Sequence, residues 1–81
     1  MNILTALREP VILDIAFIDD SIRFELADGR SISAPLEWFP RLRDASEEAR
    51  TKWELIGRGC AAHWPEVDED ISALALMGLP D

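Results

Sequence analysis

The chain has 81 residues, of which 48% are hydrophobic and 30% charged, a composition that favours a single small folded domain over residues 1–81. Its net charge of −8 at neutral pH argues against a nucleic-acid-binding domain, which normally presents a basic face. One cysteine excludes an internal disulfide framework, and neither a signal-peptide pattern nor an apolar run of roughly 20 residues is present, so we expect a cytoplasmic protein that does not contact the membrane.

Residues 13–34 alternate hydrophobic and polar side chains with a period of two, which predicts antiparallel β-strands. If Phe17 lies opposite Ile22, two strands bring one set of hydrophobic side chains to a single face: Leu13, Ile15, Phe17, Ile22, Phe24 and Leu26. This register requires a tight connection at Asp19-Asp20.

The second connection is predicted at Asp28-Gly29. A two-residue loop there would mix the faces of the strands, whereas a three-residue loop over residues 27–29 sets Phe24 opposite Ile32. We therefore predict a type I turn followed by Gly29 in the left-handed conformation, which glycine adopts without a Cβ penalty. Pro35 should end the third strand, because proline cannot donate to a ladder.

The middle of the chain predicts helices. Pro35 and Pro40 are five residues apart, so a long helix cannot run through residues 36–42. We expect one or two short helical turns there, the second of which Pro40 opens. A better helix is expected to begin at the N-cap Ser46, and the spacing of Ala49, Trp53 and Ile56 predicts a stripe that covers the sheet, ended by the glycines at 57 and 59.

The last third of the chain predicts one more strand and one more helix. Residues 60–64 are expected to form a fourth strand that Pro65 ends. The acidic residues 66–70 should cap a helix over residues 71–77, which Gly78 and Pro80 are expected to end. The predicted fold class is α+β, with an antiparallel three- to four-stranded sheet covered on one face by helices in the order β-β-β-α-β-α.

Residues 63–70 contain the side chains that first suggest a metal site: His63, Glu66, Asp68 and Asp70. The glycine and glutamate of a calcium loop are absent, so we interpret these residues as a solvated acidic loop. Cys60 and His63 would point to opposite faces of a strand and could not pair as nucleophile and base. We find no cofactor motif and predict no cofactor, no metal and no enzymatic activity.

Three tryptophans are many for a chain of this length. Trp53 is predicted to lie in the core. Trp38 and Trp64 adjoin proline-bounded segments, where a large ring can either cover the core or anchor a partner, and the sequence leaves both interpretations open.

Several motifs together resemble the small bacterial family known as domain of unknown function 2442. In chain order they are Asp28-Gly29-Arg30, Trp38-Phe39-Pro40-Arg41-Leu42 and His63-Trp64-Pro65 followed by Asp68-Glu69-Asp70, and the resemblance runs from about residue 10 to residue 78. It implies a small α+β domain with no established catalytic activity or cofactor. Many family members are encoded beside another small protein, an arrangement interpreted as a toxin–antitoxin pair in which this family is the antitoxin side.

Two functions from different classes follow as hypotheses. The favoured one is a non-enzymatic protein-interaction module, an antitoxin-like acidic partner of a small basic protein encoded nearby. Its expected contact residues are Trp38, Trp64, His63, Asp68, Glu69 and Asp70. Strand edges could also support a homo-oligomer. The alternative is a small-ligand or metal-dependent enzyme that uses His63 with Asp68 and Asp70.

Overall fold

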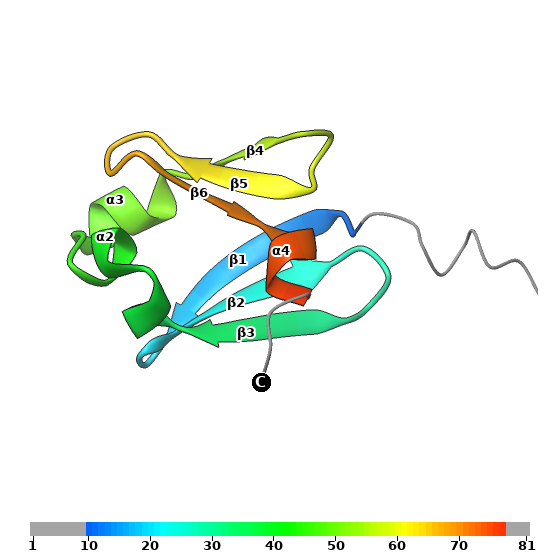
Figure 1. Ribbon diagram of the computed structural model, residues 1–81, viewed down its shortest axis with the longest axis horizontal. Coiled ribbons are helices and arrows are strands. Elements are labelled where there is room, and N and C mark those ends of the chain that lie inside the picture. The colour runs from blue at the N-terminus through cyan, green and yellow to red at the C-terminus, as the bar shows by residue number, and fades with distance from the viewer. Residues whose placement is uncertain (1–9, 78–81) are drawn as a thin grey trace, which may run out of the picture.

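Two three-stranded antiparallel sheets and short helices make up the computed structural model, which describes residues 10–77 (Figure 1). The first sheet, called sheet A, has the spatial order β1 (Ile12–Ile18), β2 (Ser21–Leu26), β3 (Ser31–Pro35). The helical segment follows as η1 (Leu36–Trp38), α2 (Pro40–Arg43) and α3 (Glu47–Thr51). The second sheet, sheet B, is β4 (Glu54–Ile56), β5 (Ala61–Trp64), β6 (Glu69–Ser72), and α4 (Ala73–Met77) ends the described chain.

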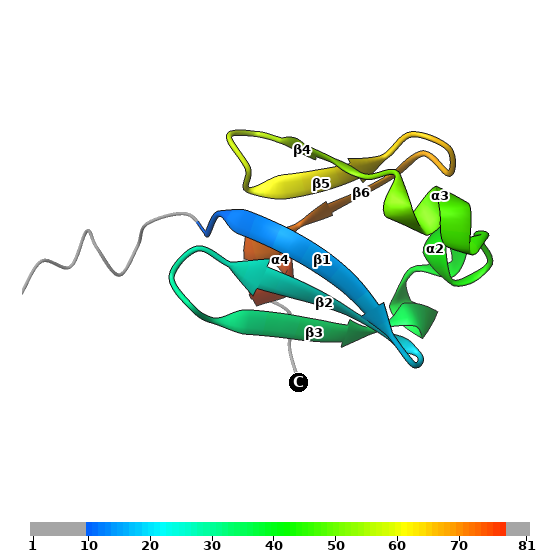
Figure 2. The same cartoon turned by 180° about the vertical axis from the view of Figure 1, so that it is seen from behind.

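The α+β class is confirmed, but the arrangement differs from the expected single sheet with a helical cover. Viewed from opposite sides, Figures 1 and 2 show β6 and α4 on one face of sheet A and its other face uncovered. Sheet A is therefore covered partly by a second sheet and not by helices alone, because residues 69–72 form a strand.

The register of the first hairpin is confirmed over most of its length, with Phe17 opposite Ile22 and Ile15 opposite Phe24. The expected place of Leu13 is wrong. An irregularity between Ile12 and Asp14 puts Ile12 opposite Leu26, and Leu13 is left 63% exposed. A bulge of this kind reverses the face on which the preceding residues lie. The Ile12 amide donates to the Gly59 carbonyl at 2.8 Å, which holds this end of β1 against the β4–β5 turn.

The second hairpin forms as predicted. Phe24 lies opposite Ile32, and the Leu26 amide donates to the Arg30 carbonyl at 2.8 Å, which closes the three-residue loop. Gly29 has a φ of +95°, in the left-handed region. The Asp28 carboxylate accepts from the Arg30 amide at 2.9 Å and so stabilises the turn from its exposed side.

The helical segment begins as predicted and ends earlier. Pro40 opens α2, and the Ser46 hydroxyl caps α3 by accepting from the Ala49 amide at 3.0 Å. The stripe of Ala49, Trp53 and Ile56 is wrong, because α3 ends at Thr51 and Ile56 belongs to β4. The Gly57-Arg58-Gly59 segment has φ values of 60°, 62° and 86°, so its glycines make a hairpin turn and do not end a helix.

The last third of the chain contains the predicted strand β5 and one strand that was not expected. Residues 69–72 pair with β5 as β6, with Ile71 opposite Ala62, and the last helix begins at Ala73. The Ser72 hydroxyl accepts from the Ala75 amide at 3.3 Å, so serine and not the acidic residues caps this helix. Gly78 and Pro80, expected to end it, lie outside the described residues.

The core lies between the inner faces of the two sheets, and Trp64 and Phe24 are its largest fully buried side chains. Within residues 10–77 no polar or charged side chain is buried in it. In that same part of the chain, no helix has the length and apolar character needed to cross a membrane.

Candidate functional site

His63 lies at the centre of the outer face of sheet B. It sits on β5 opposite Glu54 of β4 and Asp70 of β6, and its Nδ1 contacts the Asp70 carboxylate. The hydrogen bond to Asp70 raises the pKa of His63 above its ordinary value, and the negative charges of Asp70, Glu54 and Asp68 raise it further. The arrangement is a half-buried imidazole surrounded by carboxylates.

The acidic residues around His63 are not gathered as a ligand set. Glu66 pairs with Lys52 at 3.0 Å, and this bond, with that to Glu48, raises the pKa of Lys52. Glu69 has a side chain that is only 21% exposed and lies 4.0 Å from Arg41. Nowhere in residues 10–77 are three or more side chains of His, Cys, Asp or Glu placed to hold a metal ion.

The two tryptophans left open by the sequence have different roles. Trp64 is 0% exposed, its indole N–H donates to the Arg50 carbonyl at 3.1 Å, and its ring meets Phe17 edge to face. Of the two interpretations that the sequence leaves open for Trp64, the structure favours the one in which the ring covers the core, since the side chain has no exposed surface in this fold. Trp38 on η1 is 52% exposed and is available to a partner.

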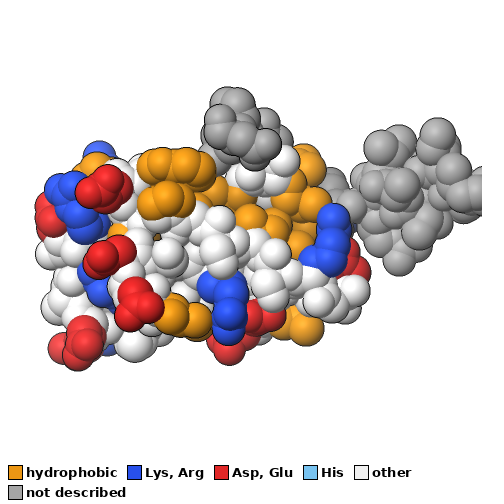
Figure 3. Space-filling model, turned by 90° about the horizontal axis from the view of Figure 1, so that it is seen from below, with side chains coloured by type: hydrophobic (Ala, Val, Ile, Leu, Met, Phe, Trp, Pro, Cys, Tyr) orange, Lys and Arg blue, Asp and Glu red, His pale blue; other side chains and the backbone are white. Residues whose placement is uncertain are grey.

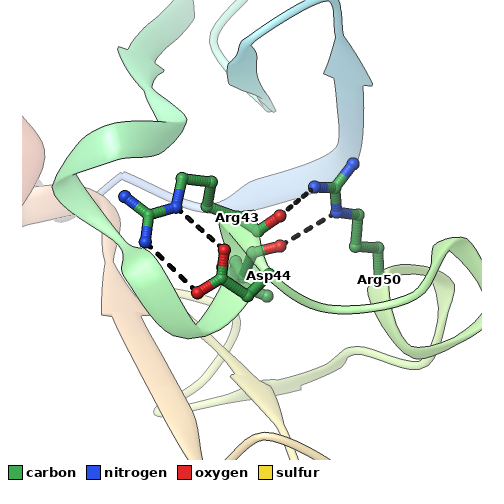
Figure 4. A network of polar contacts seen from close by, with 4 residues as sticks. Arg43, Asp44 and Arg50 are labelled. Carbon is green, nitrogen blue, oxygen red and sulfur yellow. Dashed lines mark hydrogen bonds and ion pairs between the residues drawn. The ribbon is translucent and has the colours of Figure 1, made fainter.

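Arg50 of α3 joins three elements (Figure 4). Its Nε donates to the Leu42 carbonyl at 2.9 Å and its second terminal nitrogen to the Arg43 carbonyl at 2.8 Å, which satisfies the last carbonyls of α2. Its guanidinium carbon lies 5.3 Å from the centre of the Phe17 ring of β1. Beside it, Arg43 binds both carboxylate oxygens of Asp44 and lowers the pKa of that group.

A pocket of about 680 Å³ opens between β1 and α3, and we call it the β1–α3 pocket. Its lining residues are Ile15, Phe17, Asp19, Glu47, Arg50, Thr51 and Trp53. Sequence reasoning missed it, because it assigned Phe17 and Trp53 to the core and gave Arg50 no role. No local motif marks the pocket, since it joins segments about thirty residues apart in the chain.

The β1–β2 turn, η1, α2, α3 and the β5–β6 turn lie together at one end of the molecule, on the left of Figure 1, and we call this the helical end. Two hydrogen bonds tie it together: the Leu36 amide donates to the Asp20 carbonyl at 2.8 Å, and Arg41 donates to the Asp68 carbonyl at 2.7 Å. Figure 3 shows acidic and basic side chains interspersed at this end, next to hydrophobic ones.

Several exposed carboxylates at the helical end have no ion-pair partner among the described residues. They are Asp19 and Asp20 in the β1–β2 turn, Glu37 on η1, Glu47 on α3 and Asp68 in the β5–β6 turn. The exposed Trp38 follows Glu37 directly. Of the predicted contact residues, Trp38 and Asp68 thus lie at this end, whereas His63 and Asp70 lie on the outer face of sheet B.

Comparison with known proteins places the chain among uncharacterised relatives. The family model described as "Protein of unknown function (DUF2442)" matches residues 12–79. The fold is similar to the crystal structure of a protein of unknown function from Rhodospirillum rubrum, with a TM-score of 0.71 and 25% identity over 86% of this chain and 87% of that one. A search of curated proteins gives no match. The match over residues 12–79 confirms the resemblance seen in the motifs, and the chain belongs to the DUF2442 family.

Proposed function

We propose that this chain is a non-enzymatic protein-interaction module whose helical end binds a small basic protein. The observation that carries the proposal is the group of exposed carboxylates at that end that have no ion-pair partner among residues 10–77. Uncompensated negative charge speeds the encounter with a positively charged partner and disfavours nucleic acid.

The partner that fits best is a basic protein encoded beside this one, with this chain as the antitoxin-like member of a cytoplasmic toxin–antitoxin pair. The net charge of −8 supports an acidic role in such a pair. Trp38 supplies the hydrophobic anchor, because it is half-exposed and because tryptophan is enriched among the interface residues that dominate binding energy. Asp68 and its neighbours at the helical end form the charged rim around it.

Co-expression with the neighbouring gene product tests the proposal. We expect the two proteins to elute together in size-exclusion chromatography at low salt and to separate as salt rises, because salt screens exposed charges.

Trp38→Ala should weaken the complex by about tenfold or more in calorimetry. Leu74→Ala is a matched control, since Leu74 is 56% exposed on α4, away from the helical end, and its loss should leave the affinity unchanged. Separate elution at low salt would contradict the proposal.

One observation favours the small-ligand form of the alternative enzyme, namely the contact between His63 and Asp70. A histidine oriented by a carboxylate is a common arrangement in acid–base catalysis. His63→Ala separates the two functions. A loss of the cellular effect with an intact fold and an intact complex would favour chemistry, and an unchanged effect would favour binding.

A further inference from the structure

We propose that the β1–α3 pocket receives a lysine or arginine side chain of the basic partner, together with its flanking backbone. This inference rests on the proposed function and assigns to it a particular site at the helical end. The argument uses the size of the pocket, its aromatic wall and the balance of charge in its lining.

The pocket has the size of a binding site. Its volume of about 680 Å³ falls within the usual range for ligand pockets, roughly 300–1,000 Å³. That exceeds the volume of a single side chain and leaves room for part of the occupant's backbone. One wall is strand β1 and the other is helix α3 with the segment that follows it, so an extended segment of a partner can lie between them.

The apolar part of the lining is held in place before any ligand binds. The Phe17 ring meets the buried Trp64 ring at a centroid distance of 6.3 Å and an interplanar angle of 81°. The Phe17 ring also contacts the Arg50 guanidinium, which is fixed by hydrogen bonds to two carbonyl groups of α2. Trp53, half-buried, completes this wall. A preorganised apolar wall of this kind suits the long aliphatic stem of lysine or arginine, which packs on apolar surface while its charged end stays polar.

The charge of the lining favours a cation. Asp19 and Glu47 contribute two carboxylates, and neither has an ion-pair partner within residues 10–77. Arg50 is the one cation among the lining residues, so the lining carries a net charge of −1. One incoming basic side chain neutralises this charge, whereas an acidic ligand would make the pocket more negative. The Thr51 hydroxyl donates to the Glu48 carbonyl at 2.7 Å and is already occupied within the helix.

Asp19 allows the charge to be removed without disturbing the turn. Its φ of 53° lies in the left-handed region, where asparagine is at least as well accommodated as aspartate. Asp19→Asn therefore keeps the backbone conformation and removes only the carboxylate. Glu47 is exposed on the first turn of α3, so Glu47→Gln likewise changes charge with little change in volume.

The first experiment uses small probes on the whole chain: the N-acetyl N-methylamide derivatives of lysine, of arginine and of norleucine, the last being an uncharged match for lysine. We expect the two charged probes to cause saturable shifts of the Trp53 indole N–H signal in NMR at millimolar concentration, with Trp38 unaffected. Equal shifts with the norleucine probe, or no response at Trp53, would overturn the proposal.

The second experiment tests whether the carboxylates of Asp19 and Glu47 attract the charged probes. The double variant Asp19→Asn with Glu47→Gln should bind the charged probes about fivefold more weakly, the effect of losing two exposed ion pairs. The control pair Asp14→Asn with Glu48→Gln removes the same charge from exposed residues of β1 and α3 that do not line the pocket, and should change binding by less than about twofold. Equal weakening by both pairs would overturn the proposal.

The same variants with the basic protein encoded beside this chain distinguish the two proposals. If that protein binds the wild type and the Asp19/Glu47 double variant equally well, the pocket assignment is overturned and the proposed function stands. If the charged probes bind as expected and no basic protein binds, the cation chemistry of the pocket is supported and the proposed function is contradicted.

Discussion

Sheets A and B have the same three-stranded antiparallel topology but depend on different interactions. The strands of sheet A have 7, 6 and 5 residues, and its inner face carries a continuous row of hydrophobic side chains. The strands of sheet B have 3, 4 and 4 residues, and every residue of β4 is exposed. The difference indicates that sheet A is stabilised by its own alternating pattern, whereas sheet B depends on a few buried side chains and on contacts with the helical end.

The largest expected effect comes from removing the central side chain of sheet B. Trp64→Ala should lower the free energy of unfolding by about 3–5 kcal/mol, because it leaves a large cavity. Urea denaturation measures this change. Trp64→Phe keeps an aromatic ring but loses the hydrogen bond to the Arg50 carbonyl, and should cost about 1–2 kcal/mol.

Trp38→Ala is the control for both variants, since Trp38 is half-exposed and should contribute less than about 0.5 kcal/mol. If Trp64→Ala proved no more costly than Trp38→Ala, sheet B would not depend on its buried ring, and the contrast between the sheets would fail.

A smaller effect is expected from the link between the helices and β1. Arg50→Lys removes the paired hydrogen bonds to the α2 carbonyls, which a lysine cannot reproduce, and should cost about 1–2 kcal/mol in the same denaturation experiment. Arg58→Lys, at an exposed turn, should change stability by less than about 0.5 kcal/mol. An equal response to the two substitutions would show that the Arg50 side chain does not stabilise the attachment of the helices to β1.

The β4–β5 turn offers a finer test of how sheet B is attached to sheet A. Gly57→Ala and Gly59→Ala should each cost about 1 kcal/mol, because both residues have positive φ. Gly59→Ala should cost more, since its Cβ would lie 3.2 Å from the Val11 side chain, whereas no atom lies within 4 Å of a Cβ at Gly57. Thermal unfolding compares the two, and a greater loss with Gly57→Ala would contradict the close packing of this turn on the start of β1.

The smallest effect is a pH dependence on the outer face of sheet B. Asp70 raises the pKa of His63, so the protonated ring favours the folded state. Its contribution to stability is fully present below the unfolded pKa of about 6.5 and is lost as pH rises through the higher folded pKa. An NMR titration of the His63 ring protons should show the pKa fall on Asp70→Asn and stay unchanged on Glu66→Gln, because Glu66 pairs with Lys52 instead.

The contrast between the sheets also explains what the sequence could predict. Sheet A was predictable because each strand is long enough for its alternation to be recognised, and because only one loop length keeps Phe24 and Ile32 on one face. The bulge at residues 12–14 was not predictable, since Ile12 and Leu13 are equally hydrophobic. A tertiary contact with Gly59 decides which of these two side chains faces inward.

Sheet B could not be predicted in the same way. Its residues 54–56 are too few to show a period, and the spacing of Ala49, Trp53 and Ile56 also fits a helix. Both Trp38 and Trp64 have a proline nearby, so this pattern did not distinguish the exposed ring from the buried one. Trp64 is buried because sheet B packs on sheet A, and local sequence does not show that contact. The candidate site was predicted only in part: the contact of His63 with Asp70 comes from strand pairing, and the pocket comes from the approach of α3 to β1.

The shortness of the strands has a consequence for fibril growth. In the described structure, β1 and β3 are the outer strands of sheet A, and β4 and β6 are those of sheet B. Amyloid-type stacking uses extended segments of about six or seven residues, whereas β4 offers 3, β6 offers 4, and β3 offers 5 and ends in a proline. Of the described strands only β1, with 7 residues, is long enough to act as a template, and the start of its outer border is already bonded to the Gly59 carbonyl. We expect three of the four borders to resist the addition of further copies, and any fibril of this chain to grow from β1.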